Sequence, residues 1–166
     1  SGAGNVTVTG LGASTNLSNV DPTGTLTATV TASVDISSNA ANLTTVDAFS
    51  VASAQTLTLS ATQANGETIT GAGNVTVSGL GATAVDLSAI TASGTLTAAV
   101  TASATLASTT DLGNFNVSVA SGQTLTLSAA QADGLTVSGA GNVTVTGLGA
   151  STDLSDVNPS GTLTAV

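Results

Sequence analysis

The sequence predicts an all-β protein, and within that class a β-solenoid (parallel β-helix) whose coils stack along one axis. Three observations predict it. The sequence repeats itself about every 68 residues, short runs alternate apolar residues with Thr or Ser, and aromatic residues make up only 1% of the chain. Short strands around a thin core of small side chains would satisfy all three observations.

Three sequence blocks recur in the same order along the 166 residues. Their first residues are Gly2, Gly71 and Gly139 for GAGNVTV, Gly24, Gly94 and Gly161 for GTLTA, and Gln55 and Gln123 for QTLTLSA. We therefore expect one continuous array over residues 1–166, with copies at approximately 2–70, 71–138 and, in part, 139–166. Because no distinct capping segment stands at either end, we interpret the chain as a window on a longer array or a self-stacking unit.

Alternation with period two predicts which residues point inward. In GTLTATV, for example, Leu26 and Val30 fall on one face and Thr27 and Thr29 on the other. The predicted core residues are Val6, Val8, Leu26, Val30, Leu57, Leu59, Val75, Val77, Leu96, Val117, Val119, Leu125, Leu127, Val143 and Val145. Three strands and their turns predict coils of about 17–23 residues. A small β-sandwich is the rival fold, but it usually needs a longer chain and a buried Trp or Tyr.

Glycine and asparagine at the ends of these runs predict the corners of the coils. The predicted turn residues are Gly2, Gly4, Asn5, Gly71, Gly73, Asn74, Gly139, Gly141 and Asn142. Since the three asparagines hold the same place in each copy, their side chains are expected to hydrogen-bond along the stack.

One acidic residue interrupts the apolar pattern. Alignment on QTLTLSA places Asp47 opposite Phe115 and Phe49 opposite Val117. An inward carboxylate with no cation nearby would cost several kcal/mol, on the order of 3–5. We therefore predict that the strand starts later in the first copy and leaves Asp47 in a turn.

Charge excludes several classes of partner. The chain has nine acidic residues and no Lys, Arg or His, so its net charge is −9. Without cations it cannot neutralise phosphates, which excludes the usual binding of nucleic acid and of anionic lipid. No apolar run reaches the roughly 18 residues of a transmembrane helix, so membrane insertion is not expected.

Reactive side chains are almost absent. His, Cys, Lys, Arg and Tyr are missing, so we expect no enzyme activity. Asp153 and Asp156 form the only close carboxylate pair, and the first copy has Asn16 and Asn19 at these positions. Such variation indicates a solvated turn rather than a catalytic pair.

Calcium is the one cofactor that the sequence allows, because carboxylate oxygens are its preferred ligands. The candidate ligands are Asp21, Asp153 and Asp156, all near predicted turns. The alternative is that these side chains bind backbone amides of their own turns, and we favour it. Otherwise no cofactor is expected.

The strings VASGQTLTLSAAQADGLTVSGAGNVTV (Val119–Val145) and DLSDVNPSGTLTA (Asp153–Ala165) resemble repeat regions of giant bacterial secreted and cell-surface proteins. These are Thr/Ala/Gly/Val-rich β-solenoid regions of adhesin-like, matrix-forming or filament-forming chains. The resemblance implies export, a place outside the cell or on its surface, and structural or adhesive work. Related families carry calcium-binding GGxGxD repeats, which are absent from this sequence.

The leading hypothesis is a structural component of an extracellular fibre, sheath or surface layer. Its coils would associate end to end with another molecule or continue in the same chain. The alternative is a rigid spacer in a giant adhesin. Regular Thr rows leave ice binding as a minor possibility, and carbohydrate binding is another, although Trp and Tyr stacking platforms are missing.

Overall fold

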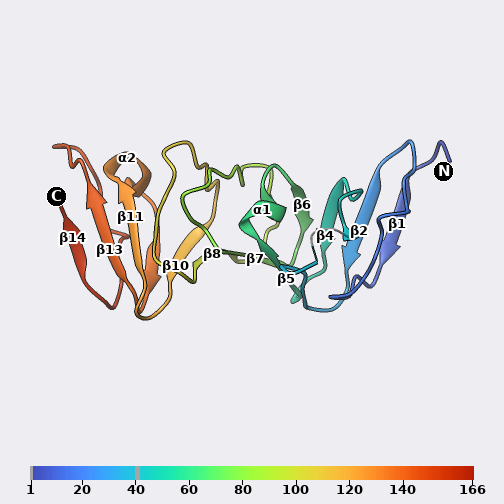
Figure 1. Ribbon diagram of the computed structural model, residues 1–166, viewed down its shortest axis with the longest axis horizontal. Helices are drawn as coiled ribbons and strands as arrows, with labels where there is room; N and C mark the ends of the chain where they lie inside the picture. The colour runs from blue at the N-terminus through green and yellow to red at the C-terminus, as the bar shows by residue number, and fades with distance from the viewer. Residues whose placement is uncertain (1, 40–41) are drawn as a thin grey trace.

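A computed structural model describes residues 2–39 and 42–166. In this part of the chain, fourteen strands and two short helices form a long, narrow molecule with its termini at opposite ends (Figure 1). Every strand pairing is parallel, and the strands stack into about 8 turns along the long axis. The predicted all-β solenoid is therefore confirmed.

The strands form three parallel sheets. The N-terminal sheet contains, in order, β1 (Val6–Thr9), β2 (Leu26–Val30), β4 (Ala48–Val51) and β6 (Thr68–Gly71). The central sheet contains β3 (Val34–Asp35), β5 (Thr56–Ser60), β7 (Asn74–Ser78), β8 (Leu96–Val100), β10 (Asn116–Val119) and β12 (Val137–Gly139). The C-terminal sheet contains β9 (Ala104–Thr105), β11 (Thr124–Ser128), β13 (Asn142–Thr146) and β14 (Leu163–Ala165).

The pairing register gives the length of each coil. Leu57 pairs with Val75, 18 residues later, and Val34 pairs with Leu57, 23 residues later. The other pairings fall within these limits, as for Val6 and Leu26, which are 20 residues apart. The coil length predicted from the sequence is thus confirmed.

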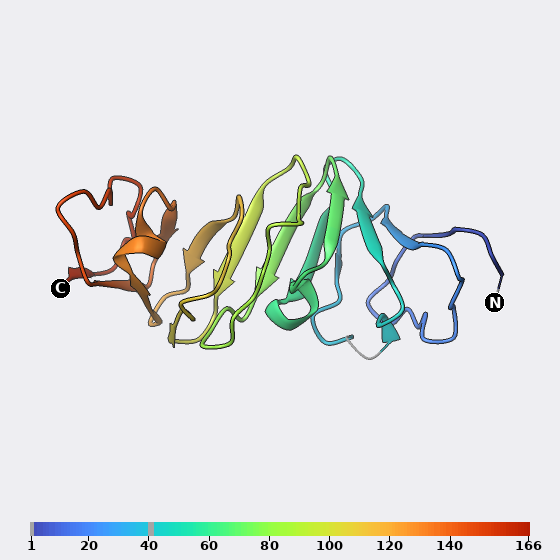
Figure 2. The same ribbon diagram turned by 90° about the horizontal axis from the view of Figure 1, so that it is seen from above.

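Equivalent strands of successive copies lie in successive sheets. The GAGNVTV strand is β1 in the N-terminal sheet, β7 in the central sheet and β13 in the C-terminal sheet. The change of sheet occurs at β8, which pairs with β7 on one edge and with β10 on the other. Each copy therefore begins one sheet further round the rod, and Figure 2 shows the coils following one another along it.

A single apolar core runs through the stack. Inward Val, Leu and Ala residues alternate with outward Thr and Ser along each long strand, as in β2 and β11. All the predicted core residues are buried except Val6 and Val8, which are half-buried in the first strand of the stack.

The described residues also contain two helices of one turn, α1 (Ala61–Ala64) and α2 (Ala129–Ala132), which sequence analysis did not predict. Each begins at a capping box in which a serine and a glutamine bind each other's backbone amides, Ser60 with Gln63 and Ser128 with Gln131. The motif S-x-x-Q was the available signal. No described helix is long and apolar enough to cross a membrane.

Asp47 lies outside β4 and is exposed, as predicted. The physical reason differs from the prediction. β4 and β10 begin at equivalent residues, and it is Val46 that occupies the place of Phe115: both are buried and both amides donate to a leucine carbonyl three residues earlier. Asp47 is thus an extra residue in the first copy, inserted just before the strand.

Candidate functional site

The corner asparagines join each coil to the next, as expected. The Oδ1 atom of Asn74 accepts a hydrogen bond of 2.8 Å from the Thr95 amide, one coil further along the stack. Asn142 binds the Thr162 amide at the same distance, and Asn5 repeats the contact in the first coil. These side chains satisfy backbone amides at a corner where no strand pairing is available.

The predicted turn glycines lie at the same corners. Gly71 and Gly139 end β6 and β12 with φ of +106° and +105°, a region that L side chains rarely adopt. Gly2 and Gly4 are exposed ahead of β1. Stacking also restricts the corner, because a Cβ on Gly94 would lie 2.7 Å from Asn74 Oδ1 and would overlap the Gly73 backbone.

Both ends of the stack expose residues that are buried elsewhere in the repeat. Leu163 in β14 is 40% exposed, whereas its counterparts Leu26 and Leu96 are 0% and 6% exposed. Leu148 is 44% exposed, against 3% for its counterpart Leu80. Among the described strands, β1 pairs only with β2 and β14 only with β13, so each has one unpaired edge.

The side faces of the rod carry rows of hydroxyl groups. Thr58, Thr76 and Thr97 occupy one row across the central sheet through successive pairings. Asp35 continues this row on β3. The C-terminal sheet repeats the arrangement on β11, β13 and β14.

The calcium candidates are exposed turn residues. The Asp153 carboxylate accepts the Ser155 amide at 2.9 Å, and the Ser155 amide and hydroxyl hold the pKa of Asp153 below its ordinary value. Asp21 and Asp156 are also exposed. Within residues 2–39 and 42–166, no three acidic side chains gather closely enough to hold a metal ion.

Asp86 shows the same local arrangement as Asp153. The Ser88 hydroxyl and then the Ser88 amide lower the pKa of Asp86, and the two bonds measure 2.6 and 2.9 Å. Asp35 is held in the same way by Ser37. These three carboxylates therefore serve their own turns.

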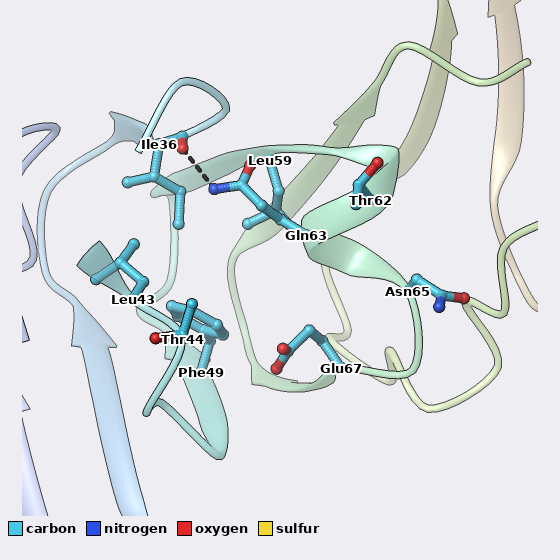
Figure 3. A pocket seen from close by; sticks show the side chains of 9 residues that line it. All are labelled: Ile36, Leu43, Thr44, Phe49, Leu59, Thr62, Gln63, Asn65 and Glu67. Atoms are coloured by element: carbon cyan, nitrogen blue, oxygen red, sulfur yellow. Dashed lines mark hydrogen bonds between the residues drawn. The ribbon is translucent and has the colours of Figure 1, made fainter. Parts of the chain in front are cut away.

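A cavity of about 260 Å³ lies beside α1 (Figure 3). Its residues are Ile36, Leu43, Thr44, Phe49, Leu59, Thr62, Gln63, Asn65 and Glu67. Gln63 is already engaged, because its Nε2 donates to the Ile36 carbonyl at 2.7 Å and its Oε1 accepts from Ser60. The Glu67 side chain is half-buried and points toward Phe49.

Two acidic groups meet at this cavity. The register of β4 and β6 places Asp47 and Glu67 side by side in adjacent coils, directly before the pair Ala48 and Thr68. Burial, and then the charge of Asp47, raise the pKa of Glu67. Sequence analysis did not single out Glu67, although the second copy has Leu135 at its place, and that contrast was the available signal.

A related cavity of about 580 Å³ lies beside α2 in the second copy. There Leu135 packs against the core, and the helix glutamine again reaches the coil below, with Gln131 Nε2 donating to the Ala107 carbonyl at 2.7 Å. The two copies thus share the architecture of this site and differ in its charge.

No family model, curated protein or solved structure matches this chain.

Proposed function

We propose that the chain is a structural solenoid, a rod segment of an extracellular fibre, sheath or surface layer that grows by stacking of coils. One observation carries the proposal. Residues exposed at the two ends, such as Leu163 and Leu148, have counterparts that the next coil buries in the interior of the same chain. A further coil on each end would therefore bury an apolar surface and pair a free strand edge.

The remaining surface suits a rod exposed to solvent. Thr and Ser cover the sheet faces, and the only charges are acidic, so side-by-side association of rods is opposed by repulsion. Growth would then be directed along the axis. The absence of Lys and Arg also leaves trypsin no site to cut.

The stacking proposal can be tested at the free edge of β14. Thr162 and Val166 direct backbone groups to β13, so strand alternation turns the Ala165 amide toward the free edge. Sedimentation and electron microscopy of the purified chain should show rods that lengthen with concentration at constant width. Ala165→Pro removes the edge amide and should stop lengthening, whereas Ala165→Ser keeps it and should not. A chain that stays monomeric at all concentrations would contradict stacking between molecules.

A rigid spacer in a giant adhesin is the second candidate. It is favoured by β8, the counterpart of β14, whose free edge is filled by β10 of the same chain. The two functions differ in covalent continuity. Denaturing electrophoresis of the native material should give one very large species for a spacer and small subunits for a polymer.

A further inference from the structure

The cavity beside α1 combines apolar walls with one carboxylate. Ile36, Leu43, Phe49 and Leu59 supply the walls, and all four are buried core residues. Glu67 lies at the opposite side and points across toward Phe49 (Figure 3). An apolar body and a charged head are therefore accommodated side by side.

Glu67 has no partner of its own in the part of the chain that the structure describes. None of its hydrogen bonds involves the carboxylate, and Asp47 in the adjacent coil is occupied by the Leu26 amide at 2.7 Å. The chain contains no cation that could reach either group. A half-buried carboxylate next to a second negative charge is costly unless a cation from outside neutralises it.

The fold itself does not require this acid. The second copy builds the same coil with Leu135, which packs against the core, and lacks the inserted Asp47. The acidic pair is thus a feature of one copy, added to an architecture that is stable without it. This contrast separates a ligand-directed role from a purely structural one.

We propose that this cavity binds a primary ammonium group on a short alkyl stem, the chemistry of a lysine side chain. The ammonium would bind the Glu67 carboxylate in the field of Asp47, with the Thr44 hydroxyl as a further acceptor. The stem would lie against Leu43 and Phe49. A compact ammonium on a four-carbon stem suits a cavity of about 260 Å³, which is small for a binding site. This binding is independent of the stacking function.

The test is titration of the full chain with n-butylammonium at pH 7, followed by NMR shifts or calorimetry. We expect binding that weakens at least about tenfold in Glu67→Gln, which keeps the shape and removes the charge. Asp156→Asn makes the same charge change at an exposed turn, where the first copy has Asn19, and should bind as the parent does. Circular dichroism would establish that each variant is folded.

Three further measurements make the inference falsifiable. Neutral 1-butanol should bind much more weakly than butylammonium, and butylammonium binding should decline as acid protonates Glu67. Lysine capped at both backbone ends distinguishes the source: if it binds, the ligand is a side chain presented by a partner polypeptide, and if only butylammonium binds, the ligand is a free amine. Equal binding to the parent and to Glu67→Gln, or no binding to the parent, would overturn the proposal.

Discussion

At the residue scale, the stack is joined by side chains that reach from one coil to the next. Asn74, Asn142 and Gln131 each satisfy a backbone group about 20 residues away in the chain. Such bonds matter at the corners, because a buried or stacked amide without a partner is unfavourable. They also explain why the same residue type recurs at the same corner of each copy.

Asn74→Ala leaves the Thr95 amide without its acceptor and should lower the free energy of unfolding by about 1–2 kcal/mol. Asn116→Ala is the matched control, since Asn116 is exposed on the outward face of β10. Its effect should stay within about 0.5 kcal/mol. Urea unfolding measures both, and equal losses would contradict the role of the corner asparagine.

Glu67 should make the first copy sensitive to pH. Because its pKa is raised in the folded chain, its ionisation opposes folding above the folded pKa, and this cost disappears as pH falls to the ordinary value of 4.5. Glu67→Gln should therefore be more stable than the parent at pH 7 and equally stable near pH 4. Glu67→Leu, the residue of the second copy, should gain about 1 kcal/mol at pH 7.

The background in this measurement has the opposite sign. Asp35, Asp86 and Asp153 have lowered pKa values, so their contribution to stability is present above the ordinary value of 3.8 and is lost as pH falls through the folded values. Comparing parent and Gln variant at each pH removes this shared term. A difference that does not change between pH 4 and 7 would contradict the assignment to Glu67.

At the scale of elements, alternation in the sequence was enough to predict the strands and their buried faces. The helices were missed because one turn is too short to show a period of 3.6 residues, although Ser60 and Gln63 spell the cap. The change of sheet at β8 could not be predicted, since strand pairing depends on the summed lengths of several turns. The Glu67 cavity was missed because alternation assigns faces and not the spaces between coils.

The helix caps offer a graded prediction. Ser128→Ala removes one cap bond and should cost about 1 kcal/mol. Gln131→Ala also removes the bond to the Ala107 carbonyl one coil away and should cost about 2 kcal/mol. Thermal and urea unfolding would rank the two. A larger loss for Ser128→Ala would mean that the cap, and not the link between coils, is the main contribution.

At the scale of the whole molecule, the same residue has different weight at the end and in the middle. Leu96→Ala opens a cavity inside the stack and should cost about 2–5 kcal/mol. Leu163→Ala at the exposed end should cost less than about 1 kcal/mol in the monomer. Unfolding at a concentration where the chain is monomeric tests this, and similar losses would show that β14 is covered.

The stacking of parallel strands has a mechanical consequence. Hydrogen bonds between strands lie along the rod, so tension applied to the two ends should open one coil at a time instead of shearing whole sheets. Each coil of about 20 residues would rise about 4.8 Å in the rod and release roughly 66 Å of extended chain. An optical trap should record repeated small steps at similar force, and a single cooperative rupture would contradict this. Under load, the molecule would act as an extensible tether.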